Sequence, residues 1–282
     1  MASFMPASEI MHHNFHLTTN DGLQLAANEW RPDSTPLLSV MLIHGQGEHM
    51  GRYHLVGEML AENGVRVIGV DLRGHGISNG KRGHIKKWSD YFQDLDAVAE
   101  LLPSRYAIIG HSMGGLLALG YGLRNQHRLS SVTVTGPLLG VSIQPAAWKE
   151  ALSGLLSVIA PALPFDSEIP MDELCSDPDT VQRFANDALR VSTVTPRWYV
   201  EMKKEIEQVM AIATQANIPL FAHMGANETI VDPEMVKKVS EMWAPAESSL
   251  TLWPGCHHEL FQESDAESII MQIFSEISKS HQ

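Results

Sequence analysis

The sequence predicts an α/β protein with a mostly parallel central sheet that is flanked by helices and interrupted by a helical insertion. Short apolar or β-branched runs alternate with longer helical patterns from residue 23 to residue 136, and again after residue 217. This alternation is typical of parallel strands that are joined by crossover helices. Between these two parts the strand signals become rare and helical runs dominate, which indicates an insertion.

Seven segments carry the strand pattern, and several of them are apolar at nearly every position, as expected for strands that helices cover on both faces. The predicted strands are 23–30, 38–44, 65–71, 106–110, 131–136, 218–225 and 248–253. The predicted helices are 54–63, 89–102, 112–125, 233–243 and 264–279 in the core, with 148–160 and 179–189 in the insertion. Asp232-Pro233 marks one helix start, since aspartate is a good N-cap and proline fits the first helical position.

The elements divide the chain into three parts. Residues 1–136 and 218–282 are the two parts of an α/β core, and residues 137–217 form a helical cap. We expect the cap to lie over one end of the sheet.

Length, charge and cysteine content limit the classes of function. The chain has 282 residues and a net charge of −13 without a basic stripe, so nucleic acid is not an expected partner. The two cysteines, Cys175 and Cys256, lie outside any CxxC pair, which favours a reducing compartment. The N-terminus lacks a signal-peptide pattern, and the most apolar segment, 152–165, is too short to cross a bilayer. We expect a soluble, cytoplasmic protein.

A candidate nucleophile lies between a predicted strand and a predicted helix. Gly110-His111-Ser112-Met113-Gly114 fits the pattern G-x-S-x-G. A tight strand-to-helix turn forces this serine into a strained backbone conformation and exposes its Oγ at the carboxyl edge of the sheet. The short pattern also occurs by chance in ordinary turns, but the flanking strand and helix favour Ser112 as a nucleophile.

A nucleophilic serine needs a base, because a free hydroxyl is a weak nucleophile near neutral pH. The base should lie on a loop after the last strand, where His257 and His258 are both available. The base in turn needs an orienting carboxylate. The loop after strand 218–225 offers Glu228 and Asp232. We favour Glu228, because Asp232 already caps a helix, and we keep Asp232 as the alternative.

An oxyanion intermediate needs two backbone N–H donors. Met113, which follows the nucleophile, should supply one of them. Gln46, in the glycine-rich loop after strand 38–44, should supply the other. The alternative for this loop is a glycine-rich turn without a catalytic role.

At four stretches the sequence resembles the α/β-hydrolase superfamily and, more narrowly, its monoacylglycerol lipase and lysophospholipase branch. These are HGQGEHMGRY (44–53), DLRGHGISNGKRG (71–83), GHSMGG (110–115) and GCHHEL (255–260). The resemblance implies the α/β-hydrolase fold with an inserted cap, Ser112 as nucleophile and His258 as base. The family usually has aspartate where this sequence has Glu228, and this departure leaves the identity of the acid open.

The resemblance implies a serine carboxylester hydrolase that cleaves a lipid monoester, such as a monoacylglycerol, without a metal or another cofactor. A lysophospholipase and a broad short-chain esterase are alternatives that use the same machinery. A non-catalytic ligand-binding protein is a more remote alternative. The sequence does not predict the oligomeric state.

The predicted partner is a small lipid ester. His44, Gly45 and His111 are candidate substrate-binding residues in the loops around Ser112. The apolar cap segment adds three further candidates, which are Leu155, Leu156 and Ile159. The same segment could also make transient contact with a membrane surface.

Overall fold

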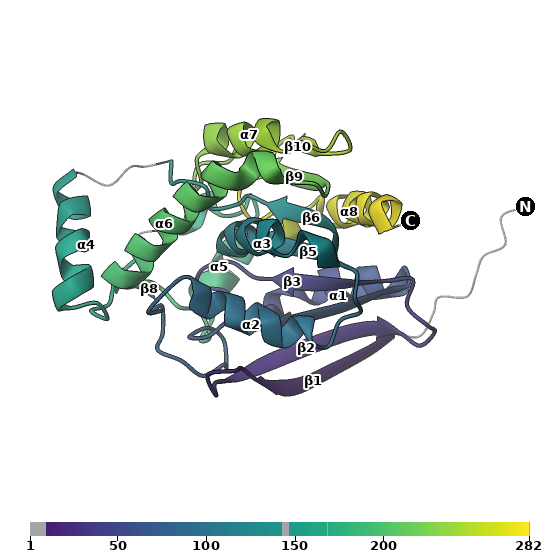
Figure 1. The fold of residues 1–282 in the computed structure, drawn as a ribbon, viewed down its shortest axis with the longest axis horizontal. Coiled ribbons are helices and arrows are strands. Elements are labelled where there is room, and N and C mark those ends of the chain that lie inside the picture. Colours follow the sequence, from purple (N-terminus) through teal and green to yellow (C-terminus); the bar gives the residue numbers. More distant parts are fainter. Residues whose placement is uncertain (1–9, 143–146, 168, 282) are drawn as a thin grey trace, which may run out of the picture.

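A mixed but mostly parallel sheet organises the chain. The computed structural model describes residues 10–142, 147–167 and 169–281. Within them, one eight-stranded sheet has the order β1-β2-β4-β3-β5-β6-β9-β10 (Figure 1). Its strands are β1 (Ile10–Thr18), β2 (Gln24–Pro32), β3 (Leu38–Ile43), β4 (Val65–Val70), β5 (Tyr106–His111), β6 (Leu129–Thr135), β9 (Leu220–Gly225) and β10 (Ser249–Trp253).

Strands β4, β3, β5, β6, β9 and β10 run parallel, as predicted, whereas β1 and β2 form an antiparallel edge. The prediction did not include β1. Its sequence, IMHHNFHLT, has no apolar run, and most of its residues are exposed because it is an edge strand that pairs with β2 alone. Strands β3, β5, β6 and β9 are buried at every position, which explains their mostly apolar or β-branched character.

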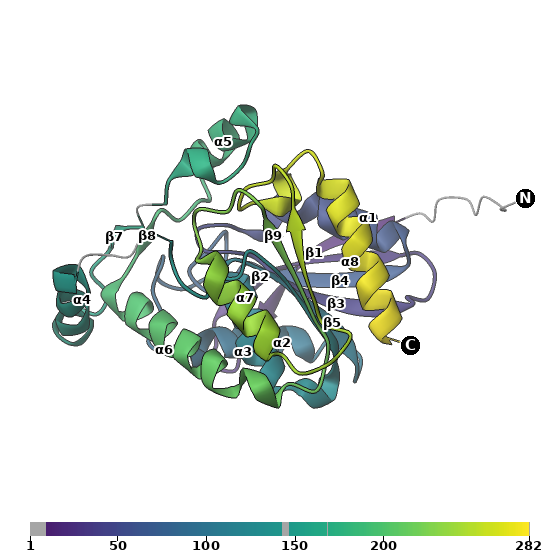
Figure 2. The same ribbon diagram turned by 90° about the horizontal axis from the view of Figure 1, so that it is seen from above.

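Helices cover both faces of the sheet. The helices of the described chain are α1 (His54–Glu62), α2 (Ser89–Ala99), α3 (Met113–Arg124), α4 (Ala147–Ile159), α5 (Pro178–Ala185), α6 (Pro196–Ile212), α7 (Pro233–Met242) and α8 (Ala266–His281), and six of them cover the sheet. Helices α1 and α8 lie on one face, and α2, α3, α6 and α7 lie on the other (Figures 1 and 2). Each face has its own apolar core, with Leu60 and Ile273 in the first and Leu95 and Leu117 in the second.

Three helices begin with the same local signature, an oxygen-bearing N-cap followed by proline. Asp232 accepts hydrogen bonds from two backbone N–H groups at the start of α7, as the sequence predicted. Asp177 does the same for α5, and Thr195 caps α6. These caps satisfy N–H groups that have no partner inside a helix.

The segment between β6 and β9 contains α4, α5 and α6, together with the short strand pair β7 (Phe165–Asp166) and β8 (Thr193–Val194). Helix α4 stands away from the sheet and contacts α6 (Figures 1 and 2). Glu150 of α4 binds Lys203 of α6 at 2.8 Å and accepts a hydrogen bond from Tyr199 at 3.1 Å. The helical segment agrees with the predicted cap, although α6 was not among the predicted helices; the domain boundaries stay a prediction.

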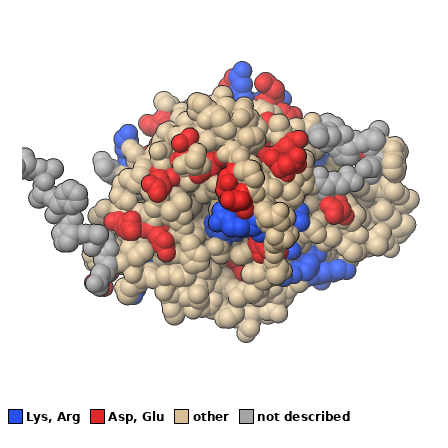
Figure 3. Space-filling view, turned by 180° about the vertical axis from the view of Figure 1, so that it is seen from behind, with Lys and Arg blue, Asp and Glu red and all other residues tan. Residues whose placement is uncertain are grey.

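None of the described helices is both long and apolar enough to cross a membrane. On the face shown in Figure 3, lysine and arginine side chains are interspersed with acidic ones and do not merge into a basic stripe.

Candidate active site

Ser112 lies at the carboxyl edge of the sheet in an unusual backbone conformation. Its φ is 52° and its ψ is −115°, and no other described non-glycine residue has a positive φ. The backbone around it holds this conformation: its N–H donates to the Thr135 carbonyl at 2.9 Å, and its carbonyl accepts from Leu116 and Leu138. Strain of this kind persists only where the surroundings determine it, and it is frequent at active sites.

The turn at Ser112 packs tightly against the end of β3. A Cβ atom added to Gly114 would lie 2.3 Å from the Ile43 carbonyl oxygen and 2.5 Å from that of His44. Both of these are backbone atoms that cannot move aside easily. The glycine therefore lets the helix start approach the loop that contains Gln46.

His258 and Glu228 form a buried pair. His258 Nδ1 lies 2.7 Å from Glu228 Oε2, and the two side chains are 3% and 1% exposed. The other carboxylate oxygen of Glu228 accepts hydrogen bonds from the backbone N–H groups of Ile230 and Val231. Burial alone would raise the pKa of Glu228, but His258 and these backbone donors lower it. The carboxylate is thus held ionised and aimed at the imidazole.

Asp232 and His257, the alternatives to Glu228 and His258, lie outside this buried pair. Asp232 accepts from Glu234 and Met235 at the start of α7, so its carboxylate is engaged as a helix cap. The His257 backbone N–H donates to Glu263 at 2.8 Å, and His257 does not line the pocket that contains Ser112 and His258.

The two expected oxyanion donors are free to bind a ligand. Within residues 10–142, 147–167 and 169–281, the backbone N–H groups of Gln46 and Met113 donate to no protein acceptor. Met113 is the first residue of α3, where N–H groups have no partner inside the helix. A Cβ added to Gly45 would lie 3.1 Å from the Ser112 Cβ, so the Gln46 loop lies beside the nucleophile.

A small pocket lies at Ser112, Gln46 and His258; its cavity volume is about 40 Å³, and about 480 Å³ when the open space at its mouth is included. Five of the residues singled out from the sequence line it, namely Ser112, His258, Gly45, Gln46 and His111. Its apolar lining comes from residues that the sequence analysis did not single out, namely Ile169, Met171, Leu174, Val191 and Ile230. They belong to loops without a periodic pattern, so nothing in the sequence marked them.

The structure does not bring four other candidates to this pocket. Leu155, Leu156 and Ile159 belong to α4, and Leu155 and Ile159 are 57% and 67% exposed. The His44 side chain is fully buried; its Nδ1 donates to the Gly45 carbonyl and its Nε2 accepts from the Leu72 N–H. Burial lowers the pKa of His44 to about 4, so the ring is neutral and holds the loop in place.

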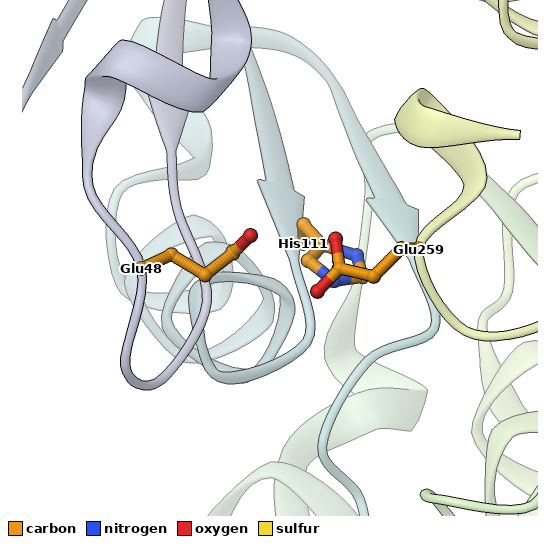
Figure 4. Close-up of side chains that lie close together, drawn as sticks. All are labelled: Glu48, His111 and Glu259. Atoms are coloured by element: carbon orange, nitrogen blue, oxygen red, sulfur yellow. The ribbon is translucent and has the colours of Figure 1, made fainter. Parts of the chain in front are cut away.

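Three buried side chains that also line this pocket lie close enough together to share a cation. They are Glu48, His111 and Glu259, whose nearest side-chain oxygen and nitrogen atoms all lie within 4.8 Å of one another (Figure 4). No other set of three or more histidine, cysteine, aspartate or glutamate side chains in the described part of the chain is arranged in this way. The Arg52 guanidinium already lies 3.8 Å from Glu48, so a positive charge is present at the cluster.

Arg52 also joins the core to the cap. Its Nε and Nη2 both donate to Asp187, at 3.0 and 2.8 Å, and its guanidinium lies 4.0 Å from the centre of the Phe184 ring. Beside it, the Val191 N–H donates to the Gly47 carbonyl at 3.1 Å. The cap is thus fastened to the loop that contains Gln46.

The fold and this site define an α/β-hydrolase. The family model described as serine aminopeptidase, S33, matches residues 34–265, and the chain belongs to this family. The resemblance to the monoacylglycerol lipase branch, inferred from the motifs, is confirmed.

Relatives and solved structures agree over most of the chain. Phospholipase YtpA of Bacillus subtilis is 32% identical over 85% of this chain and 94% of its own length. A monoacylglycerol lipase of Mycolicibacterium smegmatis is 26% identical over 90% of this chain and 92% of its own length. The crystal structure of Paleococcus ferrophilus monoacylglycerol lipase superposes with a TM-score of 0.82 at 25% identity, covering 96% of this chain and 99% of that one.

Proposed function

We propose that this chain is a serine carboxylester hydrolase that cleaves lipid monoesters, releasing a fatty acid and, from a monoacylglycerol, glycerol. One observation carries the proposal: Glu228 lies 2.7 Å from His258, and His258 lines the same pocket as the strained Ser112. Relatives that are named monoacylglycerol lipase and phospholipase support a lipid ester as the substrate.

The reaction would proceed through an acyl-enzyme. The Nε2 atom of His258 accepts the Ser112 hydroxyl proton while Oγ attacks the ester carbonyl, and Glu228 stabilises the imidazolium that forms. The Gln46 and Met113 backbone N–H groups bind the oxyanion. His258 then protonates the departing alcohol, and a water molecule that it deprotonates hydrolyses the acyl-enzyme to the fatty acid.

The lining of the pocket supports an acyl chain as part of the substrate. Five apolar side chains from three loops face the space next to Ser112 and His258; they are Ile169, Met171, Leu174, Val191 and Ile230. Burying an acyl chain against them removes apolar surface from water, at about 25 cal/mol per Å².

A lysophospholipid is the second candidate substrate, and Arg190 favours it. This residue lines the pocket, and its guanidinium has no hydrogen-bond or ion-pair partner within the described part of the chain. A guanidinium binds a phosphate group through charge-assisted hydrogen bonds. The relative named phospholipase YtpA supports the same alternative.

The cap supports a further proposal, transient contact with a lipid surface. Helix α4 exposes apolar side chains that recur along one face at helical spacing; they are Trp148, Leu152, Leu155 and Ile159. Glu150, on a different face, binds α6.

The test is kcat/KM on 1-monoacylglycerols of increasing chain length and on lysophospholipids of matched chain length, with Ser112→Ala as the blank. We expect activity that rises with chain length and is abolished in Ser112→Ala. A maximum at short chains would indicate a general esterase, and a preference for lysophospholipids that Arg190→Gln removes would indicate the second candidate. Equal activity of Ser112→Ala and the wild type would refute the acyl-enzyme mechanism.

A further inference from the structure

The three segments that carry the proposed catalytic groups also bring three ionisable side chains together beside those groups. His111 directly precedes Ser112, Glu259 directly follows His258, and Glu48 is two residues after Gln46. The three side chains are buried and point toward one another (Figure 4). Each loop therefore contributes one ionisable side chain to a shared cluster.

The contacts of His111 favour a protonated ring. Nδ1 lies 3.0 Å from both the carbonyl oxygen and the hydroxyl of Thr135; the carbonyl can only accept and the hydroxyl can accept as well, so a protonated Nδ1 suits both contacts. Nε2 lies 3.4 Å from the Glu259 carboxylate, another acceptor. An unprotonated Nε2 would turn its lone pair toward that carboxylate at a buried position, which is costly. A second proton on Nε2 removes this conflict.

The surrounding charges favour the same state. Burial alone would lower the pKa of His111, but Glu259, Glu48 and Glu228 raise it to about 9. Positive charge nearby is scarcer: the Arg52 guanidinium lies beside Glu48, and the His258 ring centre is 4.8 Å from that of His111. Burial would likewise raise the pKa of Glu259, but His111 beside it holds this pKa well below its usual range.

Glu48 holds the third loop to the cluster. Its Oε2 accepts hydrogen bonds from the Gly45 N–H at 2.6 Å and from the Tyr53 hydroxyl at 2.7 Å. Its Oε1 is buried and accepts no hydrogen bond within the described residues, which leaves it to interact with the charges of Arg52 and His111.

We propose that His111 is an imidazolium whose pairing with Glu259 holds His258 opposite Ser112, so that both are positioning residues. The pair joins the residue before the nucleophile to the residue after the base. This inference rests on the proposed function for its catalytic consequence, but the charge state of His111 does not depend on it. A divalent cation bound by Glu48, His111 and Glu259 is the competing explanation of the cluster.

The charge state can be measured directly on the full chain by nitrogen-15 NMR of histidine-labelled protein, with His111→Gln to assign the signal. We expect both ring nitrogens of His111 to be protonated from pH 6 to pH 8 and to titrate near pH 9. A neutral ring at pH 7 would overturn the proposal, whether or not the protein hydrolyses esters.

The catalytic consequence is tested by the pH profile of kcat/KM. In His111→Gln the remaining carboxylates stabilise the protonated form of the base, so the acid limb should move to higher pH by about one unit. The double variant His111→Gln/Glu259→Gln removes one charge of each sign and should bring the limb back toward its wild-type position. An acid limb that stays in place in His111→Gln would contradict the proposal.

Two controls separate positioning from general destabilisation and from metal binding. His223 is also a buried histidine, paired with Glu276 at 3.0 Å outside the site, so His223→Gln should leave the acid limb unchanged. Treatment of the wild type with EDTA should leave kcat unchanged. If EDTA lowers kcat and Zn²⁺ restores it in the wild type but not in His111→Gln, the cluster is a metal site and the proposal fails.

Discussion

The carboxyl edge of the sheet buries ionisable side chains, whereas helix α4 exposes apolar ones. At the edge, the ionisable side chains of Glu228 and His258 are almost fully buried and are bonded to each other. On α4, the apolar side chains of Leu155 and Ile159 are mostly exposed. Burying a charge is costly unless it is paired, and exposing an apolar face is costly unless something covers it. The edge therefore holds paired charges away from water, as the proposed chemistry requires, whereas α4 leaves an apolar face exposed, as the proposed contact with a lipid surface requires.

The largest expected effect is the fall in kcat when Glu228, the proposed acid of the site, is replaced. Glu228→Ala removes the carboxylate that orients His258 and should lower kcat on the order of 10⁴-fold. Asp232→Ala is the matched control, because it removes a carboxylate from the same loop that only caps α7. It should cost about 1 kcal/mol of stability and change kcat little.

The comparison needs kcat together with the free energy of unfolding for both variants. The reverse order, with Asp232→Ala the more damaging to kcat, would make Asp232 the acid of the site. A similar fall in kcat for both variants would indicate that the loop as a whole, and not one carboxylate, supports His258.

A smaller effect is the loss of folding stability that we expect as the pH rises and His111 loses its proton. The pKa of His111 is about 9 in the folded chain, above its ordinary value of 6.5. A raised pKa stabilises the fold fully below pH 6.5, and this contribution is lost as the pH rises through 9. Urea unfolding of the wild type should therefore show a loss on the order of 2 kcal/mol over this interval, beyond any loss in His111→Gln. Parallel pH dependences of the two proteins would argue against a charged His111.

The smallest effect on turnover is expected for a substitution on the exposed face of α4. Leu155→Asn lies on an exposed face, so stability should change by less than about 0.5 kcal/mol and turnover of a soluble short-chain ester should not change. Binding to phosphatidylcholine vesicles should weaken several-fold in a sedimentation assay. Leu37→Asn, which alters an exposed leucine outside the cap, is the control. Equal vesicle binding by the wild type and both variants would contradict contact through α4.

Local sequence was sufficient where local chemistry sets the structure. The G-x-S-x-G turn at Ser112 is packed too closely for a side chain at either glycine, and Asp232 followed by proline marks the start of α7. Buried parallel strands are mostly apolar or β-branched, so β3, β5, β6 and β9 were predictable. Strand β1 and helix α6 were not, because an exposed edge strand and a charged helix carry weaker patterns.

Tertiary structure decided what depends on contacts between distant loops. The sequence left two carboxylates for His258, and the loops after β9 and β10 bring Glu228 to it while Asp232 turns to α7. The cluster of Glu48, His111 and Glu259 joins three loops that lie far apart in the chain, and no spacing rule connects them. Capping and turn chemistry act over a few residues and can be read locally, whereas charge pairing acts through space and depends on which strand ends the sheet places side by side.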